Sequence, residues 1–174
     1  MKTYVIKNQK DLEKHKDEFG YHIKGNAEFE INGIMEFDDQ LKIDGYLYIK
    51  AGGSIKAGEF IKAGGSIEAG EFIKAGGSIE AGWYIDAGGY IKAGEFIKAK
   101  QGITAFLHIT CKLSLNVGLR IFAGVCNWRN ITDKDKTITC KKLENGEIAY
   151  GILNETGLEK EKLITLSNGA KVSE

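Results

Sequence analysis

The stretch from residue 49 to residue 60 reads IKAGGSIKAGEF, which is two nearly identical units of six residues. Similar units recur with a period of six across residues 31–126. A fixed short period is typical of proteins built from stacked coils, in which each coil buries its apolar side against its neighbours. The sequence therefore predicts an all-β fold, a single-chain β-solenoid (β-helix) of six-residue repeats.

Within one unit, Ile49 and Ala51 stand two positions apart, so they share a face of an extended segment. We expect both side chains to point inward, the intervening Lys50 to point outward, and Gly52 to form the corner through a positive φ angle. The predicted inward column comprises Ile31, Phe37, Ile43, Ile49, Ile55, Ile61, Ile67, Ile73, Ile79, Ile85, Ile91, Ile97, Ile103, Ile109, Leu115 and Ile121.

The last two positions of the units indicate how many units make one coil. They alternate between Gly-Ser and an acidic-aromatic pair. Two units per coil would stack Glu59 on Glu71 at about 4.8 Å, and like charges in register are destabilising. Three units per coil stack residues 18 apart, so that Phe72 lies between Ser54 and Tyr90. We therefore expect a three-sided coil, with a flattened two-sided coil as the alternative.

The repeat divides the chain into three parts: an N-terminal cap over residues 1–30, the solenoid over 31–126, and a C-terminal cap over 127–174. Caps are expected because an uncovered terminal coil exposes unpaired strand edges. The N-terminal cap is predicted to be a small α/β unit, with a strand at Thr3–Ile6 and a charged helix from Gln9 to Phe19.

The C-terminal cap is predicted to contain a β-hairpin. Residues 137–150 carry an Asn145-Gly146 pair, which is the strongest short-range hairpin signal. A second pair, Asn168-Gly169, predicts another turn, and the segment 157–166 fits either a short helix or a strand.

Composition narrows the range of partners. The chain has 24 Lys+Arg and 24 Asp+Glu, a net charge of +0, so we expect no direct binding of nucleic acid and no attraction to a membrane surface. Its three cysteines show no paired spacing and are expected to be free thiols. Without an apolar leader or a long apolar run, the chain is predicted to be soluble and cytoplasmic.

The histidines and the glycine-rich units form no catalytic or metal-binding motif in the sequence. His15 and His22 are separated by Gly20, and His108 has no acidic neighbour in sequence to orient it. The glycine-rich units lack the following helix that a phosphate cradle needs. We therefore predict no catalytic residue, no cofactor and no metal, and expect the chain not to be an enzyme.

Two groups of residues are predicted to contact a protein partner. The first is aromatic: Trp83 and Tyr84 interrupt the Glu-Phe alternation, and Tyr90 follows one unit later. Trp and Tyr dominate the energetics of protein interfaces. The second group is acidic and consists of Glu36, Asp38 and Asp39. It lies in a segment where six acidic residues face a single lysine, a local balance of −5, which suits the basic nucleic-acid channel of a nuclease.

Across residues 31–126 the pattern resembles bacterial and phage-type hexapeptide-repeat β-solenoids, including the bactofilins, which polymerise end to end. It also resembles the hexapeptide acyltransferases in part, but in those enzymes the small inward residue stands before the anchor and a loop leaves the coil. Our leading hypothesis is a non-enzymatic protein-binding solenoid, an anti-CRISPR-like phage or mobile-element inhibitor of a host defence nuclease. A self-assembling scaffold is the alternative, an acyltransferase is third, and a homodimer stays open.

Overall fold

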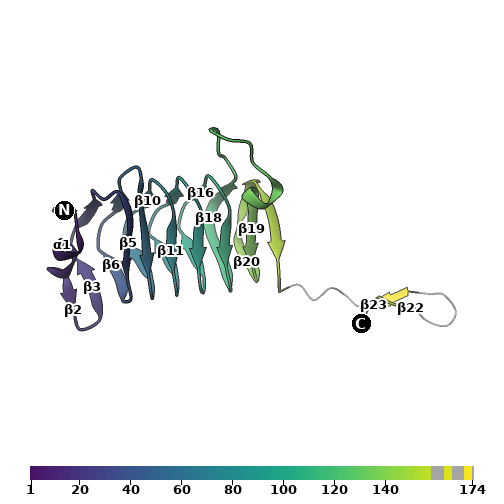
Figure 1. Ribbon diagram of the computed structural model, residues 1–174. Coiled ribbons are helices and arrows are strands. Elements are labelled where there is room, and N and C mark those ends of the chain that lie inside the picture. Colours follow the sequence, from purple (N-terminus) through teal and green to yellow (C-terminus); the bar gives the residue numbers. More distant parts are fainter. Residues whose placement is uncertain (158–162, 166–170, 174) are drawn as a thin grey trace.

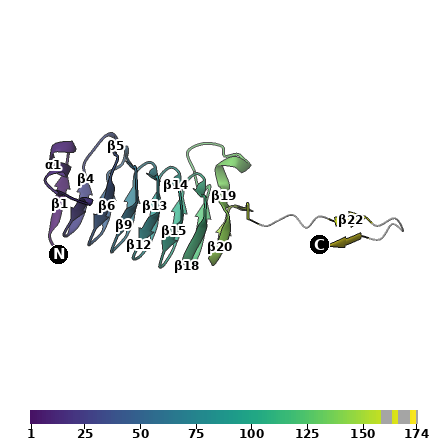
Figure 2. The same ribbon diagram turned by 90° about the horizontal axis from the view of Figure 1, so that it is seen from below.

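The computed structural model describes residues 1–157, 163–165 and 171–173. Short parallel strands wind into a three-sided solenoid, and strands of successive turns lie side by side along its axis (Figure 1, Figure 2). The first face comprises β1 (Thr3–Ile6), β4 (Asn26–Phe29), β7 (Leu47–Ile49), β10 (Ile67–Ala69), β13 (Ile85–Ala87) and β16 (Ile103–Ala105). The second face comprises β3 (Gly20–Ile23), β6 (Gln40–Ile43), β9 (Ile61–Ala63), β12 (Ile79–Ala81) and β15 (Ile97–Ala99).

The third face is a separate sheet, comprising β5 (Gly33–Phe37), β8 (Gly53–Ala57), β11 (Ile73–Ala75), β14 (Ile91–Ala93), β17 (Ile109–Cys111), β19 (Thr137–Cys140) and β21 (Ile152–Glu155). The long strand β18 (Ser114–Ala123) pairs with β15 and with β16, so it rounds the corner between the second and first faces. Between Ile55 and Ala123, paired residues are 18 positions apart, as in Ile67 with Ile85 and Ile73 with Ile91. The prediction of a three-sided coil is confirmed.

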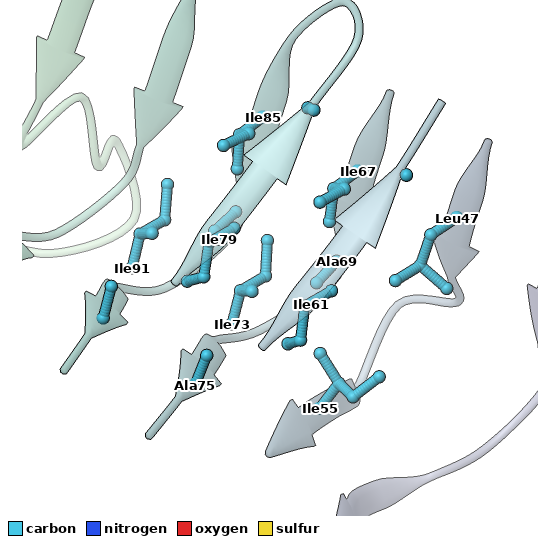
Figure 3. Close-up of a cluster of buried hydrophobic side chains, with 14 of the residues drawn as sticks. Leu47, Ile55, Ile61, Ile67, Ala69, Ile73, Ala75, Ile79, Ile85 and Ile91 are labelled. Carbon is cyan, nitrogen blue, oxygen red and sulfur yellow. The ribbon is translucent and has the colours of Figure 1, made fainter. Parts of the chain in front are cut away.

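The core is a set of isoleucine columns with alanines beside them. Ile61, Ile79 and Ile97 stack in register and have no exposed surface. Figure 3 shows isoleucines from all three faces pointing into one interior. Burying one such side chain contributes about 1.5–3 kcal/mol relative to leaving it exposed. Because every coil repeats this burial, the isoleucine columns are the main source of stability along the solenoid.

Before Ile55 the predicted inward residues are buried, but their predicted register is wrong, because paired residues there are 20 positions apart. Leu47 pairs with Ile67, so Ile49 pairs with Ala69 and takes the small inward position. Phe37 and Ile43 likewise pair with the alanines Ala57 and Ala63, and Ile31 lies outside the strands. The two inward residues of these early strands are both large, so the apolar period alone did not show which of them was the anchor.

The positive φ predicted for Gly52 is confirmed at 83°, but the same conformational reason is wrong for the glycines of the regular repeats. Among the described residues, positive φ occurs only at six glycines: Gly20, Gly33, Gly52, Gly124, Gly146 and Gly151. A repeat glycine such as Gly76 instead lies against the previous coil, where an added Cβ would be 1.9 Å from the carbonyl oxygen of Gly58. These corners need glycine because two backbones approach too closely for a side chain.

At the N-terminus, β1 forms as predicted, but helix α1 covers only Gln9–Glu13. Asn8 begins the helix by accepting a hydrogen bond from the Asp11 amide at 3.2 Å. The chain then forms β2 (Lys16–Asp17), which pairs antiparallel with β3. The predicted helix to Phe19 is therefore too long, because its last residues are used to start the first coil.

The hairpin predicted over residues 137–150 is absent. β19 pairs in parallel with β17, and β20 (Lys142–Tyr150) pairs in parallel with β18, so this segment continues the coil. Asn145-Gly146 bends β20 where β18 rounds its corner: Gly146 has a φ of 120°, and the Asn145 amide donates to the Val117 carbonyl at 2.9 Å. The Asn145-Gly146 pair therefore bends strand β20 but does not reverse the direction of the chain.

Beyond the coil, β22 (Leu163–Thr165) and β23 (Lys171–Ser173) pair antiparallel, so the segment 157–166 includes a short strand. The turn predicted at Asn168-Gly169 lies outside the described residues. Stacked strands extend past residues 31–126 on both sides, from β1 to β21. The three-part division of the chain stays a prediction. Between β18 and β19 a loop containing the short helix η1 (Asp133–Lys136) leaves the coil (Figure 1).

Candidate protein-binding surface

The 18-residue register places the outward residue of every third unit on the same face. On the third face this aligns Lys56, Lys74 and Lys92. On the first face it aligns Glu68 with Asp86, continuing to Tyr48 on one side. Charges that alternate along the chain are therefore separated in space, with lysines on one face and carboxylates on another.

Two adjacent carboxylates of the first face, Glu68 and Asp86, have no cationic partner among the described residues. Glu68 and Asp86 are register neighbours, and neither forms an ion pair within residues 1–157. Glu68 accepts a hydrogen bond from the Tyr84 hydroxyl at 2.6 Å. Burial, followed by the negative charge of Glu68, raises the pKa of Asp86 above its usual value. This part of the face therefore carries uncompensated negative charge.

The same carboxylates line a shallow hollow of about 280 Å³, walled by Tyr48 and Phe106. Tyr48 is exposed at one end of the hollow. An aromatic wall beside paired carboxylates can receive a positively charged side chain, because the ring covers its apolar stem while the carboxylates hold its charge.

Trp83 stands at the corner between the second and first faces, immediately before Tyr84. Trp83 is 58% exposed. Its backbone amide donates a hydrogen bond to the Gly65 carbonyl of the previous coil at 3.3 Å, so its backbone is fixed while its indole faces solvent. Its register neighbour Gly65 has no side chain with which to cover the indole. We call the group Tyr48, Glu68, Trp83, Tyr84 and Asp86 the Trp83 surface.

Tyr84 is less exposed than Trp83 and is fixed by its hydrogen bond to Glu68, which raises the pKa of its hydroxyl. The two predicted contact residues Trp83 and Tyr84 thus lie together. Tyr90 lies at a different corner, between the first and third faces. Its ring is stacked between Phe72 at 4.9 Å and His108 at 5.1 Å, so both of its faces are covered.

The predicted acidic group is largely neutralised by neighbouring lysines. Glu36 forms an ion pair with Lys56 on the third face, and Asp39 forms one with Lys16 at 2.8 Å. Asp38 is exposed, and its carbonyl lies against Gly58 of the next coil. The three residues are close in the sequence, but two of them are already paired with lysines. They therefore do not form an acidic patch that is available to a partner.

Sequence reasoning missed Tyr48, Glu68 and Asp86. Charges were counted along the chain, where Glu68 and Asp86 are interleaved with lysines. The available signal was the 18-residue spacing itself: applying it to the outward positions would have placed these two carboxylates in one column.

The histidines are used in local contacts. His22 is 2.8 Å from a carboxylate oxygen of Asp44, and His15 packs edge-on against Tyr4. His108 is stacked on Tyr90, and burial lowers its pKa. Within the part of the chain that the structure describes, three or more metal-binding side chains do not gather at any point.

No family model, curated protein or solved structure gave a significant match to this chain. Among the described helices, none has the length and apolar character needed to cross a bilayer.

Proposed function

We propose that this chain is a non-enzymatic protein-binding solenoid of the cytoplasm, and that the Trp83 surface contacts a partner bearing positive charge. The observation that carries the proposal is the pair Glu68–Asp86, which is stacked in register without an ion-pair partner within residues 1–157, while the exposed Trp83 stands at the corner that precedes the strand of Asp86. Like charges at this spacing are unfavourable in the free protein. A partner that supplies a lysine or arginine relieves that repulsion while Trp83 buries apolar area.

The aromatic residues and the carboxylates of the Trp83 surface are expected to contribute to binding in different ways. Trp83 and Tyr48 are rigid, amphipathic side chains of the kind that contribute most to binding. The two carboxylates set specificity and the rate of association more than they set affinity. Tyr84, held by Glu68, keeps the carboxylate oriented before the partner arrives.

A basic nucleic-acid channel is one partner surface of this chemistry. We propose that the chain inhibits a host defence nuclease in the manner of an anti-CRISPR protein carried by a phage or mobile element. Support comes from the carboxylate pair Glu68–Asp86 on the first face, whose two residues lie on adjacent strands at the usual spacing of about 4.8 Å. The inhibitor would occupy the channel with carboxylates in place of phosphates.

A self-assembling scaffold is the second candidate. Within the described residues, the last strands of the coil, β20 and β21, each pair on one side only. Tyr150, Ile152 and Leu153 are exposed there. Unpaired strands with exposed apolar side chains favour end-to-end addition of a second copy. Sedimentation velocity distinguishes the two candidates, since a scaffold forms larger species as concentration rises and an inhibitor does not.

The test begins with the purified chain as bait in a lysate of its native host, followed by purification of the recovered protein and measurement of its affinity. Trp83→Ala should weaken binding at least about tenfold, because an exposed anchor is removed while the core stays intact. Phe19→Ala is the matched control, since Phe19 is an exposed aromatic residue, 69% exposed, between β2 and β3 at the N-terminal end of the solenoid.

The charge component is tested by the double variant Glu68→Gln, Asp86→Asn against the control Glu18→Gln. The double variant should slow association and flatten its salt dependence, and the control should do neither. Equal losses from Trp83→Ala and Phe19→Ala, or no change from the double variant, would show that the partner contacts another surface.

A further inference from the structure

The corner between the third and second faces contains an aromatic column with one ring missing. Ile61, Ile79 and Ile97 are in register, so the residues just before them, Phe60, Ser78 and Phe96, form a column across three coils. Phe60 and Phe96 line a hollow of about 620 Å³, together with Gly77 and Ser78. The small residues of the middle coil thus leave a slot between two phenylalanines.

The corner between the first and third faces shows what a filled column looks like. There Phe72, Tyr90 and His108 occupy successive coils, with ring centroids 4.9 and 5.1 Å apart and planes within 5° of parallel. One coil step therefore accommodates one flat ring. Phe60 and Phe96 are two steps apart, about 9.6 Å at the usual strand spacing, so a single planar group fits between them.

The rim of the slot is negatively charged. Glu59 and Glu95 line it and are exposed, and Glu95 accepts a hydrogen bond from the Ser78 hydroxyl at 2.9 Å. The third carboxylate, Glu80, is paired with Lys62 at 3.3 Å. Among the described residues, Glu59 and Glu95 form no ion pair, so the complementary ligand is flat and positively charged.

A guanidinium group meets both requirements. It is planar, it stacks on aromatic faces, and its N–H groups lie in the plane where they can donate to carboxylates at the rim. We propose that the slot binds an arginine side chain of a partner protein, with the guanidinium stacked between Phe60 and Phe96 and donating to Glu59 and Glu95. A lysine ammonium carries the same charge but has no flat surface to fill the space.

This site is separate from the Trp83 surface, which lies across the first face and its corner with the second face. Its test therefore does not depend on the proposed nuclease inhibitor. The probe is the capped tripeptide Gly-Arg-Gly, titrated into isotopically labelled full-length protein and followed by NMR, with Gly-Lys-Gly at the same ionic strength for comparison. The arginine peptide should shift the amides of Gly77 and Ser78 and bind about tenfold more tightly than the lysine peptide.

Four variants, one of them a control, test which side chains of the slot are responsible for binding. Ser78→Phe supplies the missing ring and should abolish the arginine-specific shifts. Because the larger side chain also tests folding, the conservative pair Glu59→Gln and Glu95→Gln gives a second measurement, in which affinity falls about fivefold for each. Glu71→Gln is the matched control: Glu71 holds the same place in its unit, but beside the filled column of Phe72 and Tyr90.

The proposal is overturned if the arginine and lysine peptides shift the same amides with equal affinity, or if neither shifts Gly77 and Ser78. It is also overturned if Glu71→Gln weakens binding as much as Glu59→Gln does, because the effect would then be one of net charge alone.

Discussion

The corner glycines yield a sharp test of the fold, because two adjacent glycines in one corner differ in what surrounds them. An added Cβ at Gly76 would lie 1.9 Å from the Gly58 carbonyl oxygen, whereas one at Gly77 would meet nothing closer than 3.4 Å. Neither residue has a positive φ. Gly76→Ala and Gly77→Ala therefore make the same chemical change one residue apart, with and without a steric conflict.

The expected loss of stability follows from the hydrogen bonds that join this corner to the previous coil. Moving the Gly76 Cβ from 1.9 Å out to 3.0 Å, the shortest separation that real Cβ atoms show, needs a local displacement of about 1.1 Å between coils. The Gly76 amide donates to the Ala57 carbonyl at 3.0 Å, and the Gly77 amide donates to the Glu59 carbonyl at 2.8 Å. The displacement breaks both bonds at about 0.5–1.5 kcal/mol each and loosens the isoleucine packing below. We expect Gly76→Ala to lower the free energy of unfolding by about 2–4 kcal/mol.

Gly77→Ala should change the free energy of unfolding by less than about 1 kcal/mol, and the change should be stabilising if the unfolded chain loses more freedom than the folded one. Urea unfolding followed by tryptophan fluorescence and circular dichroism measures both variants. If they lose the same stability, or if Gly76→Ala loses none, then the glycine is not required by close approach of the coils and our account of these corners is wrong.

Three further predictions concern the core, one carboxylate and the thiols. Ile73→Ala should lower the free energy of unfolding by about 2–5 kcal/mol in the same urea assay, because its side chain is fully buried in a column; a loss below about 1 kcal/mol would contradict the column. Burial raises the folded-state pKa of Asp86, so its ionisation destabilises the fold above that pKa and has no effect below the unfolded value of 3.8. Asp86→Asn should therefore raise the thermal midpoint at pH 7 and leave it unchanged near pH 3, and a constant difference across that range would refute the assignment. Burial raises the pKa values of Cys111 and Cys140 to about 12 and about 11, so iodoacetamide at pH 8 should label Cys126 first, and mass spectrometry showing equal labelling of all three would exclude buried thiols.

The sequence predicted the coil well where its units are unambiguous. In units such as Ile73-Lys74-Ala75, large and small inward residues differ, so the anchor is evident, and the repulsion that would arise between Glu59 and Glu71 in a two-unit coil favours three units per coil. Where both inward residues are large, as in Leu47 and Ile49, the apolar pattern reads equally well in two frames. The two extra residues absorbed near Gly52, whose φ is 83°, carry no apolar signal at all.

Local signals at the ends of the chain failed for a different reason. Asn145-Gly146 favours a hairpin in isolation, but β20 can bury its apolar residues only by following β18 in parallel. The charged segment ending at Phe19 has helical composition, yet its last residues pair as strand against β3. In both places the pairing offered by the adjacent coil outweighs a preference worth about 1 kcal/mol or less.

Only part of the candidate surface could be predicted from the sequence, because the outward residues of one face repeat every 18 positions whereas the core residues repeat every six. Every unit from residue 55 to residue 105 contributes an isoleucine and an alanine to the interior, so the core constrains the outward position very little. Every third unit returns to the same face, so the outward side chains that are neighbours on one face are 18 positions apart in the sequence. Examples are Glu68 with Asp86 and Lys74 with Lys92. One substitution in one unit thus alters one face without disturbing the other two. A solenoid of this kind can keep a fixed interior while each face and each corner acquires its own binding chemistry, which is why the Trp83 surface and the slot at Ser78 can be tested as independent sites.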